Sequence, residues 1–289
     1  LTLAVLAALA RLGADTTGES ALSLSRRRYL SVGRWERALN GLALVVAVGF
    51  VLAPFIAIVL SGLEANLAAI VARPSVQRAA ATSLVLAVLS ATLSVGLAWS
   101  LSAARWAAVQ RGRDAGWREF IFDRGASLVL VVPPIVIGSG WFMLLRNSTD
   151  VLALAPVMVV AVNAVMAMPF AIRAIRPAHD NGALRHDRLA AQLGISGWNR
   201  FRLIDWPTLR RALATAFVFA MALSLGDLGV IALFGSDAVQ TLPYVLLASM
   251  GSYRTADAAG IALLLGVLCL GLTLLSDLIG RGGRMEARP

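Results

Sequence analysis

The sequence predicts an all-α protein that crosses a membrane several times. Its residues are 58% apolar and only 15% charged, and its mean hydropathy is +0.77. A helix needs roughly 20 apolar residues to cross a hydrocarbon core of about 30 Å. Six stretches of the chain meet this requirement, and apolar runs of that length suit helices rather than the alternating strands of a barrel. The six predicted spans are residues 42–61, 79–101, 126–145, 154–175, 212–234 and 258–279.

The basic residues, which are all arginine, predict the orientation. Six precede the first span, five lie between the second and third, eight flank or occupy the loop after the fourth, and three follow the sixth. The four on the other side are Arg73, Arg78, Arg146 and Arg254. The positive-inside rule therefore places both termini and the central loop in the cytoplasm. The net charge of +10 does not indicate nucleic acid as a partner, because these arginines border apolar spans and suit anionic lipid.

The beginning of the chain is apolar but too short to cross a membrane. Residues 1–12 have no basic region before them, as a signal peptide would require. We interpret them as the end of a preceding transmembrane helix, followed by a cytoplasmic linker at 13–40. The six-helix domain would then occupy 41–280, with a cytoplasmic tail at 281–289. This division predicts the second half of a longer, duplicated polypeptide, and a natural start at Leu1 is the alternative.

The central loop, residues 178–211, contains two predicted amphipathic helices. The first begins near Asn181, a good N-cap, and ends at Gly194, which suits the C′ position. The second begins at Ser196 and ends before Pro207, because a residue that precedes proline disfavours helical geometry. Each helix has an apolar stripe among arginines, which indicates docking to a soluble partner; a basic loop lying on lipid headgroups is the alternative. The stripe residues are Leu184, Leu189, Leu193, Phe201 and Ile204.

The sequence contains few residues that would support catalysis. Without lysine the chain has neither a G-x-x-x-x-G-K-[ST] phosphate loop nor a Schiff base. His179 and His186 are seven residues apart, which is poor spacing for a shared metal, and Cys269 lies inside the sixth span as a packing residue. We therefore predict no catalytic residue, no metal site and no enzymatic activity.

One ionisable residue, Asp227, lies inside a predicted span. A carboxylate at this depth is costly, so it should face the bundle or water. Gly226 and Gly229 allow close helix approach and weaken the helix locally. Two roles stay open for Asp227: part of a translocation path or gate, or a structural carboxylate satisfied by backbone amides or an arginine.

Proline and glycine predict further local features. Pro133 and Pro134 should bend or break the third span, either to line a cavity or as a packing kink. In the sixth span, Gly260, Gly266 and Gly271 predict close helix contact.

The spacing of three residues in the central loop resembles a known motif. Gly194, nine residues, Ile204, two more and Pro207 is similar to the coupling loop of ABC importer permeases. The resemblance implies the type I permease fold and contact with a separate ATPase. The family's leading glutamate is replaced by Arg188, and the adjacent Asp187 is a candidate substitute. The coupling residues that the resemblance implies are Arg188, Leu189, Ala190, Gly194, Ile204 and Pro207.

Residues 189–207, 223–236, 241–243 and 251–254 together resemble the C-terminal half of thiamine and thiamine pyrophosphate import permeases of Gram-negative bacteria. This resemblance implies an N-terminal permease half in the same polypeptide, an inner-membrane location and a dimeric ATPase that hydrolyses the ATP. It also implies a periplasmic solute-binding protein.

The outward loop at 236–257 is a candidate surface for the binding protein. Its candidate contact residues are Tyr244, Tyr253 and Arg254.

Three alternative functions remain. Relatives that import ferric iron or sulfate share the loop, so the solute is open. Two alternatives belong to other classes. One is an ion-coupled secondary transporter that uses Asp227, and the other is a membrane scaffold without transport.

Overall fold

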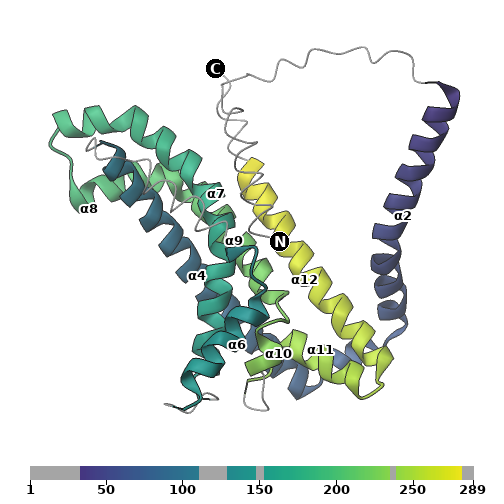
Figure 1. Cartoon of the computed structure of the whole chain (residues 1–289). Coiled ribbons are helices and arrows are strands. Elements are labelled where there is room, and N and C mark those ends of the chain that lie inside the picture. The colour runs from purple at the N-terminus through teal and green to yellow at the C-terminus, as the bar shows by residue number, and fades with distance from the viewer. Residues whose placement is uncertain (1–32, 111–128, 148–152, 235–238, 282–289) are drawn as a thin grey trace. The chain divides into compact units, whose positions relative to one another are not determined.

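The computed structural model describes residues 33–110, 129–147, 153–234 and 239–281, and the regular elements of these ranges are helices (Figure 1). Residues 1–57 and 58–289 form two compact units, which are described separately. The elements are α2 (Arg34–Glu64), α3 (Leu67–Val71), α4 (Pro74–Gln110), α6 (Pro134–Leu145), α7 (Ala155–Gln192), α8 (Gly197–Arg200), the π-helix η1 (Phe201–Asp205), α9 (Trp206–Leu225), α10 (Ile231–Phe234), α11 (Leu242–Gly251) and α12 (Thr255–Arg281).

In the first unit the described residues belong almost entirely to α2. This helix already includes residues 34–40, which the sequence analysis assigned to the linker. It is long and apolar enough to cross a membrane. The predicted stub at 1–12, the linker up to residue 32 and the tail at 282–289 lie outside the described residues.

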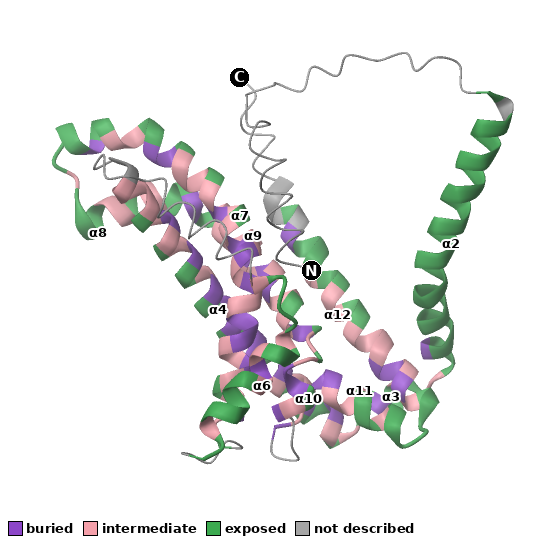
Figure 2. Cartoon of the chain, viewed as in Figure 1, coloured by how far each residue is buried: buried purple, intermediate pink, exposed green. Residues whose placement is uncertain are grey.

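The second unit is built around α4, α7 and α9, which pack side by side, with α12 against α9 (Figure 1). Where the three helices meet, the contact is made by the buried alanines Ala91, Ala167 and Ala220, one from each helix. Small side chains let helix backbones approach closely where lipid provides no hydrophobic driving force. Buried residues accordingly follow the facing sides of α4, α7 and α9, as Figure 2 shows.

Short helices close one end of this bundle. Phe234 of α10 is fully buried with Val159 and Val162 of α7, and its ring lies 6.1 Å from that of Phe142 in α6. Leu242 of α11 joins a second apolar cluster formed by Ile70, Val76, Ala79 and Ile261.

The predicted all-α, multi-pass architecture is confirmed. Within the described residues, five helices are long and apolar enough to cross a membrane, rather than six. The third predicted span, 126–145, contains only the 12-residue α6 in its described part, and residues 126–128 lie outside the description. Its predicted break is confirmed, because Pro133 has extended geometry (φ −57°, ψ 142°) immediately before α6.

The prediction of a continuous fifth span through residue 234 was wrong. Helix α9 ends at Leu225, and α10 begins only at Ile231. Between them the Asp227 carboxylate accepts hydrogen bonds from the backbone N–H groups of Gly229 (3.1 Å) and Val230 (3.4 Å). Such local side-chain bonds compete with the helical pattern, as the neighbouring glycines also do.

The sixth-span glycines differ from one another. A Cβ on Gly260 would lie 2.5 Å from Cδ1 of Ile70, which confirms a close contact with the α3 region. A Cβ on Gly266 or Gly271 would meet nothing within 4 Å, so the predicted contact was wrong for these two.

Candidate functional site

The first part of the 178–211 segment is not a separate helix. Helix α7 runs without interruption from the membrane-spanning region to Gln192, so the predicted start near Asn181 was wrong. Asn181 is an exposed residue inside the helix, and apolar periodicity continues on both sides of it. The span and the first part of the segment therefore belong to one helix, which also contains Pro169 and Pro177.

The end of α7 confirms the C′ position predicted for Gly194. Its φ of +64° is the left-handed conformation that glycine adopts at low cost. The N–H of Ile195 donates to the carbonyl of Ala190 (2.9 Å) and the N–H of Gly194 to that of Ala191 (3.3 Å). These two bonds are a Schellman motif, which turns the chain sharply towards α8.

The second part of the segment begins as predicted but does not end as predicted. Ser196 is the N-cap of α8, yet the chain continues through η1 directly into α9. Proline inside an α-helix clashes with the carbonyl four residues earlier. Here the π-helical turn widens the backbone ahead of Pro207: the N–H of Trp206 donates to the carbonyl of Phe201, five residues back. The helix therefore passes Pro207, and the predicted stop was wrong.

The segment presents an apolar surface. Leu193 and Trp198 are 64% and 72% exposed, and Leu184, Leu189 and Leu203 are exposed as well. Of the six candidate coupling residues, Arg188, Leu189, Gly194 and Pro207 are exposed, Ile204 is half-buried and Ala190 is buried. Exposed apolar side chains thus lie on both sides of the Gly194 turn in the sequence, at Leu193 and Trp198.

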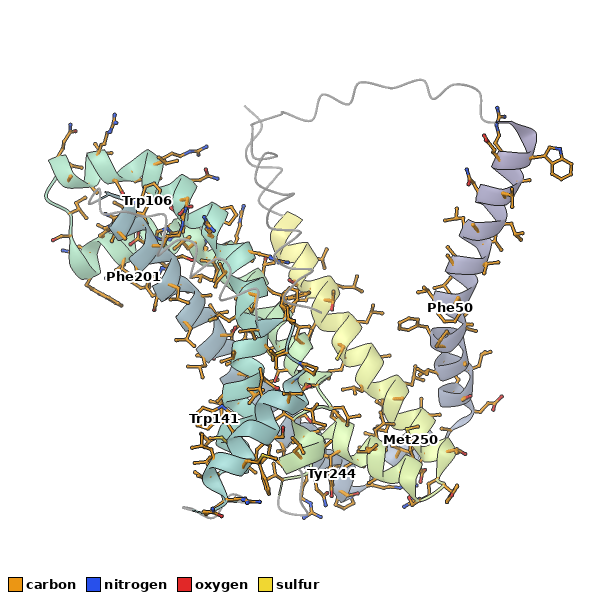
Figure 3. The ribbon with its side chains drawn as sticks, in the orientation of Figure 1. Phe50, Trp106, Trp141, Phe201, Tyr244 and Met250 are labelled. Atoms are coloured by element: carbon orange, nitrogen blue, oxygen red, sulfur yellow. The ribbon has the colours of Figure 1, made fainter. Side chains whose placement is uncertain are left out.

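The inner side of the segment is held by aromatic rings. Phe201 of η1 lies between Trp99 of α4 (centroids 5.2 Å apart) and Trp198 of α8 (5.1 Å). Figure 3 shows Phe201 and Trp106 at this same end of the bundle. Asp187, the candidate substitute for the missing glutamate, faces inward: its carboxylate accepts hydrogen bonds from the Trp106 indole and from Arg200.

A mostly apolar cavity of about 260 Å³ with a few polar groups lies among α6, α7 and α9. Asn163 is 5% exposed, lines this cavity and donates from Nδ2 to Oγ of Ser224 (3.0 Å). Asp227, Gly226 and Pro134 line it too. A Cβ on Gly229 would lie 3.5 Å from Cβ of Pro134. The chain that follows α9 therefore lies close to the first residue of α6. Sequence reasoning missed Asn163, although an amide inside an apolar stretch marked it as unusual.

The surroundings of Asp227 match the structural role considered for it, and the path role stays a prediction. The carboxylate is satisfied by two backbone N–H groups, as the structural role predicts. It also lines the cavity, as a path residue would.

The three residues predicted to contact a binding protein differ in environment. Tyr244 packs against the cluster around Phe234, whereas Tyr253 is 92% exposed (Figure 3 labels Tyr244). The Arg254 guanidinium donates to Asp257 (2.7 Å). Residues 236–238 of this loop lie outside the described residues. Sequence reasoning missed Asp257 and its second partner, Arg73, because ion pairs between distant segments leave no local pattern.

Comparison with known proteins identifies the class of this helical membrane protein. Residues 96–282 match the family model described as "Binding-protein-dependent transport system inner membrane component", and the chain belongs to this family. It is 54% identical over 279 residues, 96% of the chain, to the thiamine transport system permease protein ThiP of Brucella abortus (strain 2308). The proteins of the same name from Salmonella typhimurium and Escherichia coli K12 are 36% and 35% identical over 253 residues. The chain spans about half the length of these curated relatives.

Proposed function

We propose that the chain is the C-terminal half of an inner-membrane ABC importer permease that moves thiamine or its phosphate esters from periplasm to cytoplasm. The observation that carries the coupling role is the exposed surface of the 178–211 segment around Gly194. The proposal of thiamine is supported by the names of the full-length relatives. The other proposed partners are an N-terminal permease half in the same polypeptide and membrane lipid.

The proposed energy source is a separate, dimeric ATPase that binds and hydrolyses the ATP. Its docking site on this chain would be Arg188, Leu189, Ala190, Gly194, Ile204 and Pro207. Arg188, Leu189, Gly194 and Pro207 are exposed. Since α7 carries the segment as one continuous helix, a push on the turn would reach the membrane-spanning region directly. The arginine-rich segments, including both termini, would lie on the cytoplasmic side.

The proposed translocation path includes the cavity with Asp227, Gly226 and Gly229. Asp227 and the amide of Asn163 offer polar contacts among apolar walls. On the opposite face, Tyr253 and Arg254 would contact the periplasmic binding protein. Tyr244 is half-buried, which favours a packing role for it over direct contact.

The experiment that tests this function is uptake of labelled thiamine into cells that lack their own importer and carry the complete locus. Uptake should require an ATPase subunit with an intact ATP site and should persist when the proton gradient is collapsed and ATP is maintained. Competition by excess thiamine pyrophosphate but not by ferric iron would support the solute class. Uptake that needs the gradient and not the ATPase would favour an ion-coupled secondary transporter.

A further inference from the structure

Hydrogen bonds to Asp187 connect three helices at the 178–211 segment. Asp187 lies on α7, and its Oδ2 accepts a hydrogen bond from the indole Nε1 of Trp106 on α4 (2.8 Å). Its Oδ1 accepts from Nη2 of Arg200 on α8, and the Arg200 Nε lies 3.7 Å from Oδ1 of Asp205 on η1. One carboxylate therefore joins α4, α7 and α8 across the Gly194 turn.

The bonds of Asp187 lie beside a cavity. This cavity of about 380 Å³ is lined by Trp106, Asp187 and Arg200. Side chains do not fill the space here, so specific bonds add to the helix packing of α4 on α7 as a link between α4 and the segment. The second link from α4 to η1 is the Trp99–Phe201 ring contact.

We propose that Asp187 is a positioning residue, which keeps the 178–211 segment and α4 moving together, and that it is not a contact to the ATPase. Both of its oxygens are already engaged inside the chain, and its side chain is 22% exposed. A bond between a carboxylate and a cationic donor is stronger than one between neutral groups, so this link resists displacement when the segment is pushed. The inference rests on the proposed coupling function of the segment.

The chain provides a matched control two helical turns earlier. Asp180 also lies on α7 and pairs with Arg105 of α4 (2.9 Å), the neighbour of Trp106. Its other ion pairs among the described residues are with Arg176 and His179 of α7 itself. Asp180→Ala thus removes an α4–α7 contact of similar chemistry and leaves the bonds to Arg200 in place.

The test uses the complete transporter in proteoliposomes and measures ATP hydrolysed per thiamine transported. For Asp187→Ala we expect the ATPase to co-purify normally and this ratio to rise about tenfold, the factor that loss of one charge-assisted hydrogen bond gives. Asp180→Ala should change the ratio less than twofold. Trp106→Phe removes the donor but keeps an aromatic ring, and it should raise the ratio in the same direction. The double variant Trp106→Phe/Asp187→Ala should be no worse than Asp187→Ala, because both remove one interaction.

A second measurement does not depend on the solute. Spin labels at exposed positions Ala104 on α4 and Gln192 on the segment, in a cysteine-free permease with Cys269→Ala, report the distance distribution between the two elements. Asp187→Ala should broaden this distribution about twofold, and Asp180→Ala should not. An unchanged width, or loss of ATPase co-purification with Asp187→Ala, would overturn the proposal. Absence of thiamine transport by the wild type would instead overturn only the proposed solute.

Discussion

Arg73 and Asp257, which are 184 residues apart, form a bidentate ion pair that joins the start of α4 to the start of α12. Nη1 and Nη2 of Arg73 donate to Oδ2 and Oδ1 of Asp257 at 2.8 and 3.0 Å. Arg254, one turn before Asp257, donates to the same carboxylate. The pair adds a polar link between two long helices that also share an apolar cluster, which includes Val76 and Ala79 of α4 and Ile261 of α12.

Replacement of this pair should loosen the end of the bundle. We expect Asp257→Asn and Arg73→Gln each to lower the melting temperature of the purified full-length permease by a few degrees. The double variant should fall no further than the larger single effect, since both remove one interaction. Arg254→Gln is the control: Arg254 lies three residues from Asp257 and ties no second helix, so its effect should be smaller. If the two single decreases in melting temperature add up in the double variant, Arg73 and Asp257 do not act as one pair.

A side chain at Gly260 should destabilise the protein, in contrast to one at Gly266 on the same helix. A Cβ at residue 260 would approach Cδ1 of Ile70 to 2.5 Å and Cβ of Ala65 to 3.1 Å. Overpacking of this kind costs about 1–3 kcal/mol. Gly266→Ala meets open space and should gain up to about 1 kcal/mol from helix propensity. Thermal unfolding of the two variants should therefore shift in opposite directions, and equal shifts would refute the close contact.

Replacement of Tyr253 by glycine should raise the stability of the permease and weaken its association with the binding protein. It occupies the C′ position of α11 with φ +58°, and the N–H of Arg254 donates to the carbonyl of Ser249 (3.0 Å), which is the glycine-favouring Schellman geometry. Tyr253→Gly should raise stability by about 1 kcal/mol. If the exposed ring contacts the binding protein, the same variant weakens that association several-fold. We expect both effects, measured by thermal unfolding and by binding-protein affinity; unchanged affinity would remove Tyr253 from the proposed interface.

Asp227 should reveal its role through two substitutions. Asp227→Asn retains an oxygen that accepts from the N–H of Gly229 or Val230 but loses the charge. We expect it to reach normal abundance and to raise the KM for thiamine, a cation, about tenfold, because one charge contact is lost. Asp227→Leu loses the cap as well and should lower abundance. Normal KM in Asp227→Asn would assign the carboxylate to capping alone.

Much of this architecture could be predicted because its signals are local. Apolar length located the long helices, the Pro133–Pro134 pair marked the break before α6, and Gly194 marked the turn after α7. The helix boundaries of the 178–211 segment could not be predicted in the same way. The π-helical turn before Pro207 includes Phe201, whose ring packs between Trp99 and Trp198 on two other elements, and such contacts leave no local pattern.

In the candidate sites, too, residues with a local signal could be predicted and contacts between distant segments could not. Asp227 was conspicuous as a lone carboxylate in an apolar stretch, whereas the bond from Asn163 to Ser224 spans 61 residues. The inward direction of Asp187 depends on Trp106, 81 residues away. Only the packed helices bring such pairs together. The sequence alone therefore could not show that Asp187 faces inward and not towards an ATPase.

The measurement that tests the central claim most directly compares thiamine uptake by wild-type permease and Gly194→Glu at equal membrane abundance. A glutamate at φ +64° strains the Schellman turn and places a bulky charge on the proposed docking surface. We expect strong uptake by the wild type, uptake at least about tenfold lower in the variant, and loss of ATPase co-purification. A tenfold loss corresponds to about 1.4 kcal/mol less free energy of binding between permease and ATPase. Variant uptake equal to that of the wild type would contradict the coupling role of this turn, and no wild-type thiamine uptake would contradict the proposed solute.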